Sequence, residues 1–191
     1  DLTALAISAR SGHDEATRAF IAAAYPEVWR FCASLVDPES AEDLAQDTFV
    51  RALRTLRRYR GDASARTWLL AVARNTCYDH LRALVRQRGH EASLTPIQTA
   101  TVAGPAGQVE LVTLLARLAP ERRSAFVLTQ VLGMSYHDAA TICGCPVGTI
   151  RSRVARARAE LITAVAEGES TASDPEEDRP LRPSDERSPG A

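Results

Sequence analysis

The sequence predicts an all-α protein in which two small helical domains are joined by a flexible linker. Apolar residues make up 45% of the 191 residues, enough for a real core, while aromatic residues make up only 5% and alanine is abundant. Apolar residues recur at helical spacing on both sides of a stretch that shows no periodicity. Together these observations favour helices over sheets, in two separate units.

The expected domain boundaries follow changes in composition. We expect the first domain at residues 1–86, a linker at 87–107 and the second domain at 108–167. The linker lacks periodicity and is rich in Gly, Pro, Thr and Ala. Residues 168–191 are polar, Pro-rich and free of aromatics, with too few apolar residues to offset the entropy lost on ordering. We therefore expect a disordered C-terminal tail.

The first domain is expected to be entirely helical. Residues 3–36 carry apolar residues at helical spacing, and Pro26 is expected to begin a new helix after a kink or a short break. The next helix is expected to begin near Ser40, with Asp43 three residues later in a capping-box arrangement. Its predicted buried stripe is Ala45, Phe49, Leu53 and Leu56. A loop, RGDASA, then leads into a third long helix at residues 66–86.

The second domain carries the signals of a helix-turn-helix. Ser135 with Asp138 three residues later predicts an N-cap, Gly144 lies in a tight turn, and Pro146 suits the first position of the next helix. The second helix is expected to bury residues spaced 3, 4, 3 and 4 apart: Val147, Ile150, Val154, Ala157 and Leu161. Two helices joined by such a turn are typical of DNA readers.

Residues 151–158 of that second helix hold four arginines, three of them on the face opposite the buried stripe. The centre of that face is predicted at Ser152 and Arg156, flanked by Thr149, Arg151, Arg153 and Ala155. Arginine can form paired hydrogen bonds with guanine or bind phosphates. The alternative is a surface helix that binds nothing or whose arginines pair with Glu160. Arg158 lies near the buried side, so we expect snorkelling or a phosphate contact there.

Charge is strongly segregated although the net charge is only −1. Residues 1–50 hold nine acids and three arginines, whereas residues 51–90 hold ten arginines against Asp62 and Asp79. The basic block indicates nucleic-acid binding, although a solvated helical face would look similar.

Several classes of protein are disfavoured. All 23 basic residues are arginine, so the chain has no lysine for a P-loop or for Schiff-base chemistry. It also has no hydrolase or metalloprotease motif. We therefore predict no enzyme, no catalytic residue and no cofactor. Cys143, Cys145 and His137 lack a fourth ligand, so no metal site is predicted, and Cys32 and Cys77 are expected in the core. No apolar run of about 18 residues and no signal peptide is found, so we expect a soluble cytoplasmic protein.

Three segments carry a resemblance to a known family. AEDLAQDTFVRAL, ARTWLLAVARN and GMSYHDAATICGCPVGTIRSRVARARAEL resemble the signature segments of bacterial extracytoplasmic-function sigma factors, the smallest members of the sigma-70 family. The motifs occur in the family's order and spacing, the similarity covers residues 3–166, and the actinobacterial SigC type is the most similar. The resemblance implies a subunit of RNA polymerase. Its sigma2-like helical bundle would open the promoter at the −10 element, and its sigma4-like helix-turn-helix domain would read the −35 element.

The resemblance also implies sites. The helix carrying Glu42, Asp43, Gln46 and Asp47 matches the segment that docks on the clamp helices of the polymerase β′ subunit, and the β subunit is a further implied partner. Independently of the family, Asp43, Gln46, Asp47 and Val50 share one side of that helix, off its buried stripe, although an acidic face can also serve solubility alone.

The two DNA sites follow in the same way. RGDASA matches the loop that captures a flipped base from the melted −10 strand, and the next helix matches the −10 contact region. The expected −10 contacts are Arg60, Ser64, Arg66, Arg74, Asn75 and Arg82. Trp68 is expected in the core rather than stacking on a base. The expected −35 contacts are Thr149, Arg151, Ser152, Arg153, Ala155 and Arg156.

The remaining expectations concern the linker and partners. Family linkers are often acidic and run through the RNA exit channel of the polymerase; here Glu91 is the only acid, which puts mimicry of nucleic acid by charge in doubt. Promoter DNA and RNA polymerase core enzyme are the implied partners, and an anti-sigma protein is a further candidate. The competing hypothesis is a free-standing helix-turn-helix regulator that dimerises on a palindrome, but it leaves the acidic helix and the linker unexplained.

Overall fold

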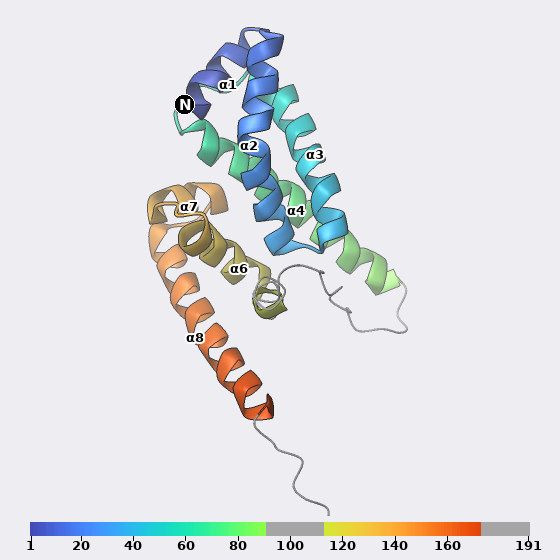
Figure 1. Cartoon of the computed structure of the whole chain (residues 1–191), viewed down its shortest axis with the longest axis vertical. Coiled ribbons are helices and arrows are strands. Elements are labelled where there is room, and N and C mark those ends of the chain that lie inside the picture. Colours follow the sequence, from blue (N-terminus) through green and yellow to red (C-terminus); the bar gives the residue numbers. More distant parts are fainter. Residues whose placement is uncertain (91–112, 173–191) are drawn as a thin grey trace, which may run out of the picture.

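The computed structural model describes residues 1–90 and 113–172, and every regular element within these two ranges is helical (Figure 1). The helices form two domains, which confirms the predicted fold class. Most of the predicted linker and of the predicted tail lies outside the described residues. Among the described helices, none is long and apolar enough to cross a membrane.

The first break in the chain differs from the prediction. Helix α1 (Leu2–Arg10) ends at a turn in which Gly12 has a φ of 89°, and α2 (Asp14–Leu35) then runs unbroken through Pro26. Starting a new helix at Pro26 was therefore wrong. Pro26 lies on the exposed side of α2, so the carbonyl that loses its partner can be solvated, and the apolar stripe on the other side continues past it.

The start of the next helix also differs. Helix α3 spans Pro38–Leu56, and its N-cap is Asp37, whose Oδ1 accepts a hydrogen bond of 2.9 Å from the Ser40 amide. The prediction of Ser40 as the cap was wrong by three residues. Asp followed by Pro at the first helical position is the stronger start signal, because the carboxylate accepts and Pro has no amide to satisfy.

Helix α4 (Ala65–His90) closes the first domain and continues four residues beyond the predicted boundary. The core of this domain lies where α2, α3 and α4 meet. The predicted stripe of α3 is largely buried, and Phe49 from that stripe meets Phe20 edge-to-face at 6.5 Å between ring centroids and stacks on Tyr25 at 5.9 Å. Trp68 is half-buried against Tyr59 at 5.1 Å.

In the second domain, residues 113–116 form a short helical turn. Helix α6 (Pro120–Phe126) follows and passes directly into a π-helical turn, η1 (Val127–Val131). In this turn the Leu132 amide donates to the Val127 carbonyl five residues back, at 2.9 Å. Periodicity in the sequence does not show such a turn, because one extra residue shifts the pattern only locally.

The helix-turn-helix is confirmed in its local details. Helix α7 (Tyr136–Cys143) is capped by Ser135, whose Oγ accepts from the Asp138 amide at 3.0 Å, and it ends at Gly144 in the left-handed conformation, with a φ of 61°. Helix α8 (Val147–Ala172) follows and continues past the predicted end at 167.

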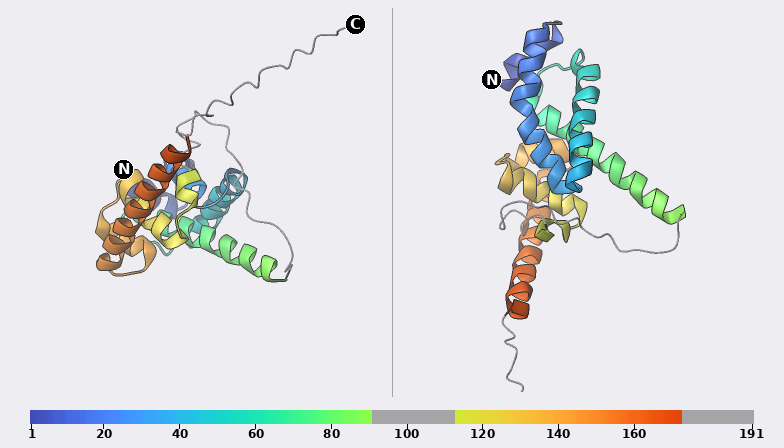
Figure 2. Two further views of the ribbon diagram at one scale, coloured as in Figure 1. Left: turned by 90° about the horizontal axis from the view of Figure 1, so that it is seen from below. Right: turned by 45° about the vertical axis from the view of Figure 1, so that its right-hand side comes forward.

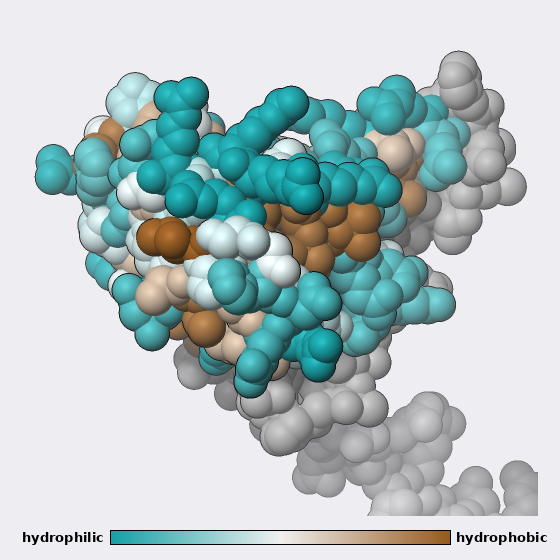
Figure 3. Space-filling model, turned by 90° about the horizontal axis from the view of Figure 1, so that it is seen from above, coloured by the Kyte–Doolittle hydropathy of each residue, from teal (hydrophilic) through white to brown (hydrophobic). Residues whose placement is uncertain are grey.

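The two domains pack against each other. Figures 1 and 2 show α6 and α7 against α4 and the end of α2, with α8 running away from the first domain. The apolar core is continuous across this boundary. On the face seen from above, apolar surface is confined to patches between long hydrophilic side chains (Figure 3). The sequence did not predict this close packing of the domains.

Candidate nucleic-acid interface

The predicted polymerase contacts lie on one exposed side of α3. Glu42, Asp43 and Gln46 are exposed and Asp47 is half-buried. Glu42 Oε1 accepts from the Tyr25 hydroxyl at 2.9 Å and from Gln46 Nε2 at 3.5 Å. Burial, and then the nearby Glu42 carboxylate, raise the pKa of Tyr25, which keeps its hydroxyl a donor. The structure thus holds Glu42 in place and leaves Asp43 open to solvent.

An ion-pair chain leads from this acidic side to α4. Arg51 Nε lies 3.0 Å from Asp47 Oδ2, and Arg51 Nη1 lies 2.9 Å from Asp79 Oδ2. Asp79 Oδ1 is also 3.6 Å from Arg82 Nη1. The hydrogen bond to Asp79 is the main reason that the pKa of Arg51 is raised. The sequence analysis missed Arg51, although Arg51 follows Asp47 by four residues, a spacing at which side chains of one helix form ion pairs.

The predicted −10 residues divide into an exposed group and an engaged group. Arg60, Asn75 and Arg82 are exposed. Ser64 is also exposed, but its Oγ accepts from the Thr67 amide at 3.0 Å and so caps the start of α4. Capping leaves Ser64 less free to contact a base than the sequence suggested.

Arg66 is turned toward the domain boundary. Its Nε lies 2.9 Å from Glu27 Oε2, its Nη2 also pairs with Glu27, and the same Nη2 donates to the Leu132 carbonyl of the second domain at 2.6 Å. The hydrogen bonds to Glu27 raise the pKa of Arg66. Next to it, Thr67 Oγ1 donates to Asp138 Oδ1 of α7 at 3.2 Å. Glu27 and Asp138 are two more residues that sequence reasoning missed.

Arg74 lies between the domains. Its guanidinium carbon sits 4.1 Å from the centroid of the Tyr78 ring, and its Nε is buried without a hydrogen-bond partner in the described part of the chain. The Tyr78 hydroxyl and Ser124 Oγ are 2.9 Å apart in a buried contact between α4 and α6. Burial raises the pKa of Tyr78.

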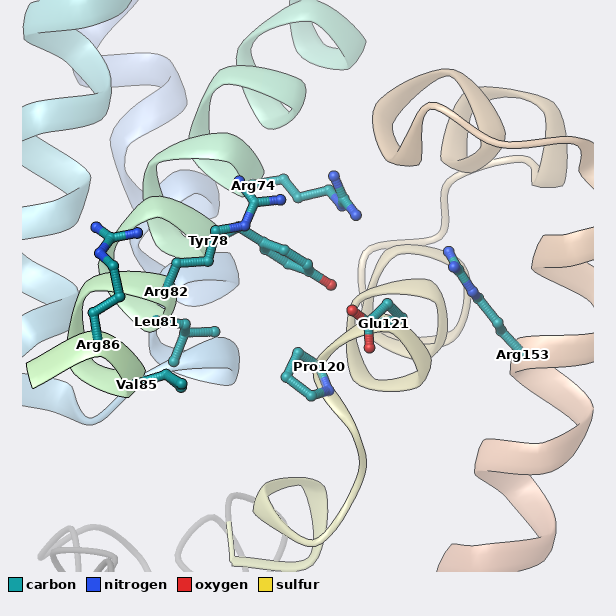
Figure 4. A pocket seen from close by; sticks show the side chains of 9 residues that line it. All are labelled: Arg74, Tyr78, Leu81, Arg82, Val85, Arg86, Pro120, Glu121 and Arg153. Carbon is teal, nitrogen blue, oxygen red and sulfur yellow. The ribbon is translucent and has the colours of Figure 1, made fainter. Parts of the chain in front are cut away.

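A groove of about 590 Å³ opens beside these residues (Figure 4). Most of its lining residues belong to α4, and the start of α6 contributes two more. In the close view, side chains of α4 face Pro120 and Glu121 of α6, and Arg153 of α8 closes the far side. The arginines of the groove are Arg74, Arg82, Arg86 and Arg153. Residues of both predicted DNA sites therefore meet in one basic groove.

The predicted −35 residues lie along the first turns of α8. Arg151, Ser152, Ala155 and Arg156 are exposed, whereas Thr149 and Arg153 are half-buried. Their shared face lies opposite the buried Ile150, Val154 and Ala157. The four exposed positions form one surface in the first turns of the helix, where the recognition helix of a helix-turn-helix contacts DNA.

Two of the arginines of α8 contact neighbouring side chains of the protein. Arg153 Nη1 lies 3.6 Å from Cys145 Sγ, which directs this side chain toward the turn. Arg158 donates to Gln130 Oε1. Glu160 pairs with Arg122 of α6 at 3.0 Å, so the pairing with recognition-helix arginines, one of the alternatives above, is not formed.

The cysteines are unpaired in the structure. Cys32, Cys77 and Cys143 are buried, and burial raises the pKa of Cys143. Within residues 1–90 and 113–172, no cluster of three or more His, Cys, Asp or Glu side chains is arranged to hold a metal ion.

The chain matches two family descriptions that together cover both domains. Sigma-70 region 2 matches residues 20–87, and Sigma-70 region 4 matches residues 108–161. A helical bundle followed by a helix-turn-helix domain, with these two matches in this order, defines a two-region protein of the sigma-70 type.

Similar proteins narrow the class. The probable RNA polymerase sigma-C factor of Mycobacterium bovis is 48% identical over 165 residues, covering 84% of this chain and 89% of that protein, and the ECF RNA polymerase sigma factor SigC of Mycobacterium tuberculosis gives the same values. The RNA polymerase sigma-H factor of Pseudomonas aeruginosa is 36% identical over 64% of this chain and 71% of that protein. The chain belongs to the extracytoplasmic-function sigma factors of the sigma-70 family.

Solved structures agree with this assignment. The sigma factor RpoE of Bartonella quintana, solved with the anti-sigma factor NepR, is 30% identical with a TM-score of 0.66, over 82% of this chain and 97% of that one. CnrH, solved with the cytosolic domain of CnrY, is 27% identical with a TM-score of 0.69, over 87% of this chain and 99% of that one. The resemblance read from the sequence motifs is thus confirmed.

Proposed function

We propose that this chain binds RNA polymerase core enzyme and directs it to promoters, where it recognises the −10 and −35 elements, helps to melt the DNA and so starts transcription. Family membership supports this function. The observation that carries it in the structure is the pairing, on one small protein, of an open acidic side on α3 with an arginine-rich recognition helix α8. Opposite charges on separate surfaces suit one protein partner and one nucleic-acid partner.

Residue roles follow from position. We assign polymerase binding to Glu42, Asp43, Gln46 and Asp47. The −10 contacts are assigned to the exposed Arg60, Ser64, Asn75 and Arg82, with Arg66 and Arg74 joining them when the domains separate. Arg66 and Arg74 need that separation because they lie at the domain boundary in the structure. The −35 contacts are assigned to Thr149, Arg151, Ser152, Arg153, Ala155 and Arg156.

Further features of the proposal follow from the class. Sigma factors are regulatory DNA-binding proteins, and we propose that this chain acts without catalysis or a cofactor of its own. Because its proposed partner is RNA polymerase, we place it in the cytoplasm. The similar RpoE was solved with the anti-sigma factor NepR, and we extend the anti-sigma class of partner to this chain.

Transcription in vitro tests the function. Purified chain and core polymerase are incubated with a genomic library, and the start sites are mapped. The expected result is initiation at a set of sites that share −35 and −10 sequences, together with DNA binding that needs core enzyme. Specific binding of the chain alone to a palindrome, without core-dependent transcription, would instead identify a free-standing regulator.

A matched pair of variants tests the polymerase contact. Asp43→Asn/Asp47→Asn removes two charges from the acidic side of α3, and Asp14→Asn/Glu15→Gln removes two charges from the start of α2. The first pair is expected to weaken co-purification with core enzyme at least tenfold, since charged interface contacts are worth about 1.5 kcal/mol or more each. The second pair is expected to behave like the wild type. Equal affinity of both variants for core enzyme would refute the assignment.

A further inference from the structure

One side of α4 forms an exposed polar stripe with helical spacing. Its residues are Asn75, Asp79, Arg82 and Arg86, spaced 4, 3 and 4 apart, and all are exposed. Asn75 and Arg82 belong to the proposed −10 contacts. Asp79 lies between them and is the one acid in the sequence of α4.

A carboxylate at this position opposes DNA binding unless its charge is compensated. Single-stranded DNA brings a phosphate every nucleotide, and like charges at contact distance repel each other. Arg82 compensates the negative charge of Asp79 only weakly, because its Nη1 lies 3.6 Å from Asp79 Oδ1. In the proposed complex Arg82 would also be engaged by DNA. The closer cation is Arg51 of α3, at 2.9 Å from Asp79 Oδ2.

We propose that Arg51 is a positioning residue for −10 DNA: it neutralises Asp79 from the neighbouring helix and frees Arg82 to contact the strand. This inference rests on the proposed function and adds a residue that lies outside the DNA-binding set. Arg51 needs no contact with DNA for this role, because its guanidinium approaches Asp79 from the side of α3.

Arg51 also connects the two proposed binding surfaces. Its Nε is held at 3.0 Å by Asp47, which lies on the acidic side of α3, and its Nη1 is held by Asp79. When a cation of the polymerase engages Asp47, the guanidinium is left to Asp79 alone. Neutralisation of Asp79 is then stronger in holoenzyme than in the free chain, and the effect is reciprocal because binding free energies are linked.

The test uses holoenzyme reconstituted from the full chain and core polymerase. The probe is a fluorescent single-stranded oligonucleotide with the −10 element obtained by start-site mapping, and its dissociation constant is measured by anisotropy. Arg51→Ala is expected to weaken binding about three- to tenfold, the range of one screened charge. Asp79→Asn is expected to bind as tightly as the wild type or more tightly. Arg51→Ala/Asp79→Asn is expected to return to within twofold of Asp79→Asn.

Rescue by the second substitution separates this role from a structural one. The double variant still lacks the bridge between α3 and α4, so a defect caused by loosened packing would persist in it. Arg54→Ala is the matched control, because Arg54 is an exposed arginine on the same helix and no ion pair is formed by it in the described structure. Circular dichroism checks that all variants are folded.

The outcomes distinguish this inference from the proposed function. If the wild-type chain binds core enzyme and transcribes, but Arg51→Ala matches Arg54→Ala, only the role of Arg51 is overturned. A defect that persists in the double variant overturns it as well. If the wild-type chain forms no holoenzyme, the proposed function fails and this inference fails with it.

Discussion

Arg66 and Glu27 form a two-nitrogen ion pair that also reaches the second domain. The Nε and Nη2 of Arg66 face the Glu27 carboxylate, and Nη2 donates to the Leu132 carbonyl 66 residues away. One arginine therefore joins α2, the start of α4 and the turn before α7. It is also a proposed −10 contact, so DNA and the second domain compete for the same guanidinium.

This pairing predicts a measurable loss of stability. Glu27→Gln keeps the shape of the side chain and removes its charge, so it is expected to lower the free energy of unfolding by about 0.5–1.5 kcal/mol, a range reduced for partial exposure. Urea unfolding at pH 7 measures this change. Glu15→Gln, at an exposed position, is the control and should change stability by less than about 0.5 kcal/mol. Equal effects of the two substitutions would contradict the importance of the pair.

The cap of α3 predicts a pH dependence. Burial of Asp37 opposes its ionisation, but the hydrogen bonds from Ser40 prevail and lower its pKa. A lowered folded pKa means that the stabilisation is present above the ordinary pKa of about 3.9 and is lost as the pH falls below it. Asp37→Ala should cost about 1 kcal/mol at pH 7.

Asp37→Asn separates the effect of the carboxylate charge from that of the capping hydrogen bond. It retains an oxygen acceptor for the Ser40 amide and does not titrate. The difference in stability between wild type and Asp37→Asn, measured by urea unfolding, is expected to shrink between pH 7 and pH 3. A difference that stays constant over this range would show that the ionised carboxylate contributes nothing to the cap.

The turn of the helix-turn-helix predicts opposite effects at two glycines. Gly144 has a φ of 61°, whereas Gly148 lies in α8, and an added Cβ would meet nothing within 4 Å at either position. Gly144→Ala should therefore cost about 1–2 kcal/mol through backbone strain alone. Gly148→Ala should stabilise by about 0.5–1 kcal/mol, because alanine favours helix. Thermal unfolding measures both, and a shift of the same sign would refute this explanation.

Two arginines of α8 predict different changes in promoter binding. Arg156 is exposed at the centre of the recognition face, so Arg156→Ala should lose about 1–3 kcal/mol of discrimination at one −35 position. Arg153 is half-buried beside Cys145, and we assign it to a phosphate rather than to a base. Arg153→Ala should therefore weaken binding to all promoter sequences alike and reduce the slope of log affinity against log salt concentration by about one.

A panel of −35 variants and a salt titration of holoenzyme binding separate these effects. Arg151→Ala, at the flank of the same exposed face, serves for comparison. If Arg156→Ala transcribes every −35 variant in the same proportions as the wild type, the helix does not read bases through that residue.

Local signals in the sequence predicted the second domain well. Ser135 and Gly144 act within a few residues, so cap, turn and the stripe of α8 could be placed without tertiary information. The first domain was predicted less well, because Pro26 is tolerated on the solvent side of α2 and Asp37 overrides Ser40 as the cap. The first error arose because burial, unknown from sequence, decides whether a helix tolerates Pro. The second arose because the stronger local signal, Asp37 followed by Pro38, was not chosen over Ser40.

Contacts between the domains were beyond sequence reasoning. The hydroxyl groups of Tyr78 and Ser124 are 46 residues apart, and Thr67 and Asp138 are 71 residues apart. Such pairs depend on how two helical units dock, which no periodicity encodes. The assignment of DNA and polymerase contacts came from exposed faces and the family motif, and these contacts stay predictions.

The length of α8 separates the proposed DNA-recognition face, at the start of the helix, from the end of the helix at Ala172. Its 26 residues span roughly 39 Å at 1.5 Å per residue. Only its first turns carry the recognition face, and Figure 1 shows its other end pointing away from the first domain. A fluorophore or affinity handle attached near residue 172 would therefore lie farther from the recognition face than the diameter of a DNA duplex. It could report on rotation of this helix without contacting the bound DNA.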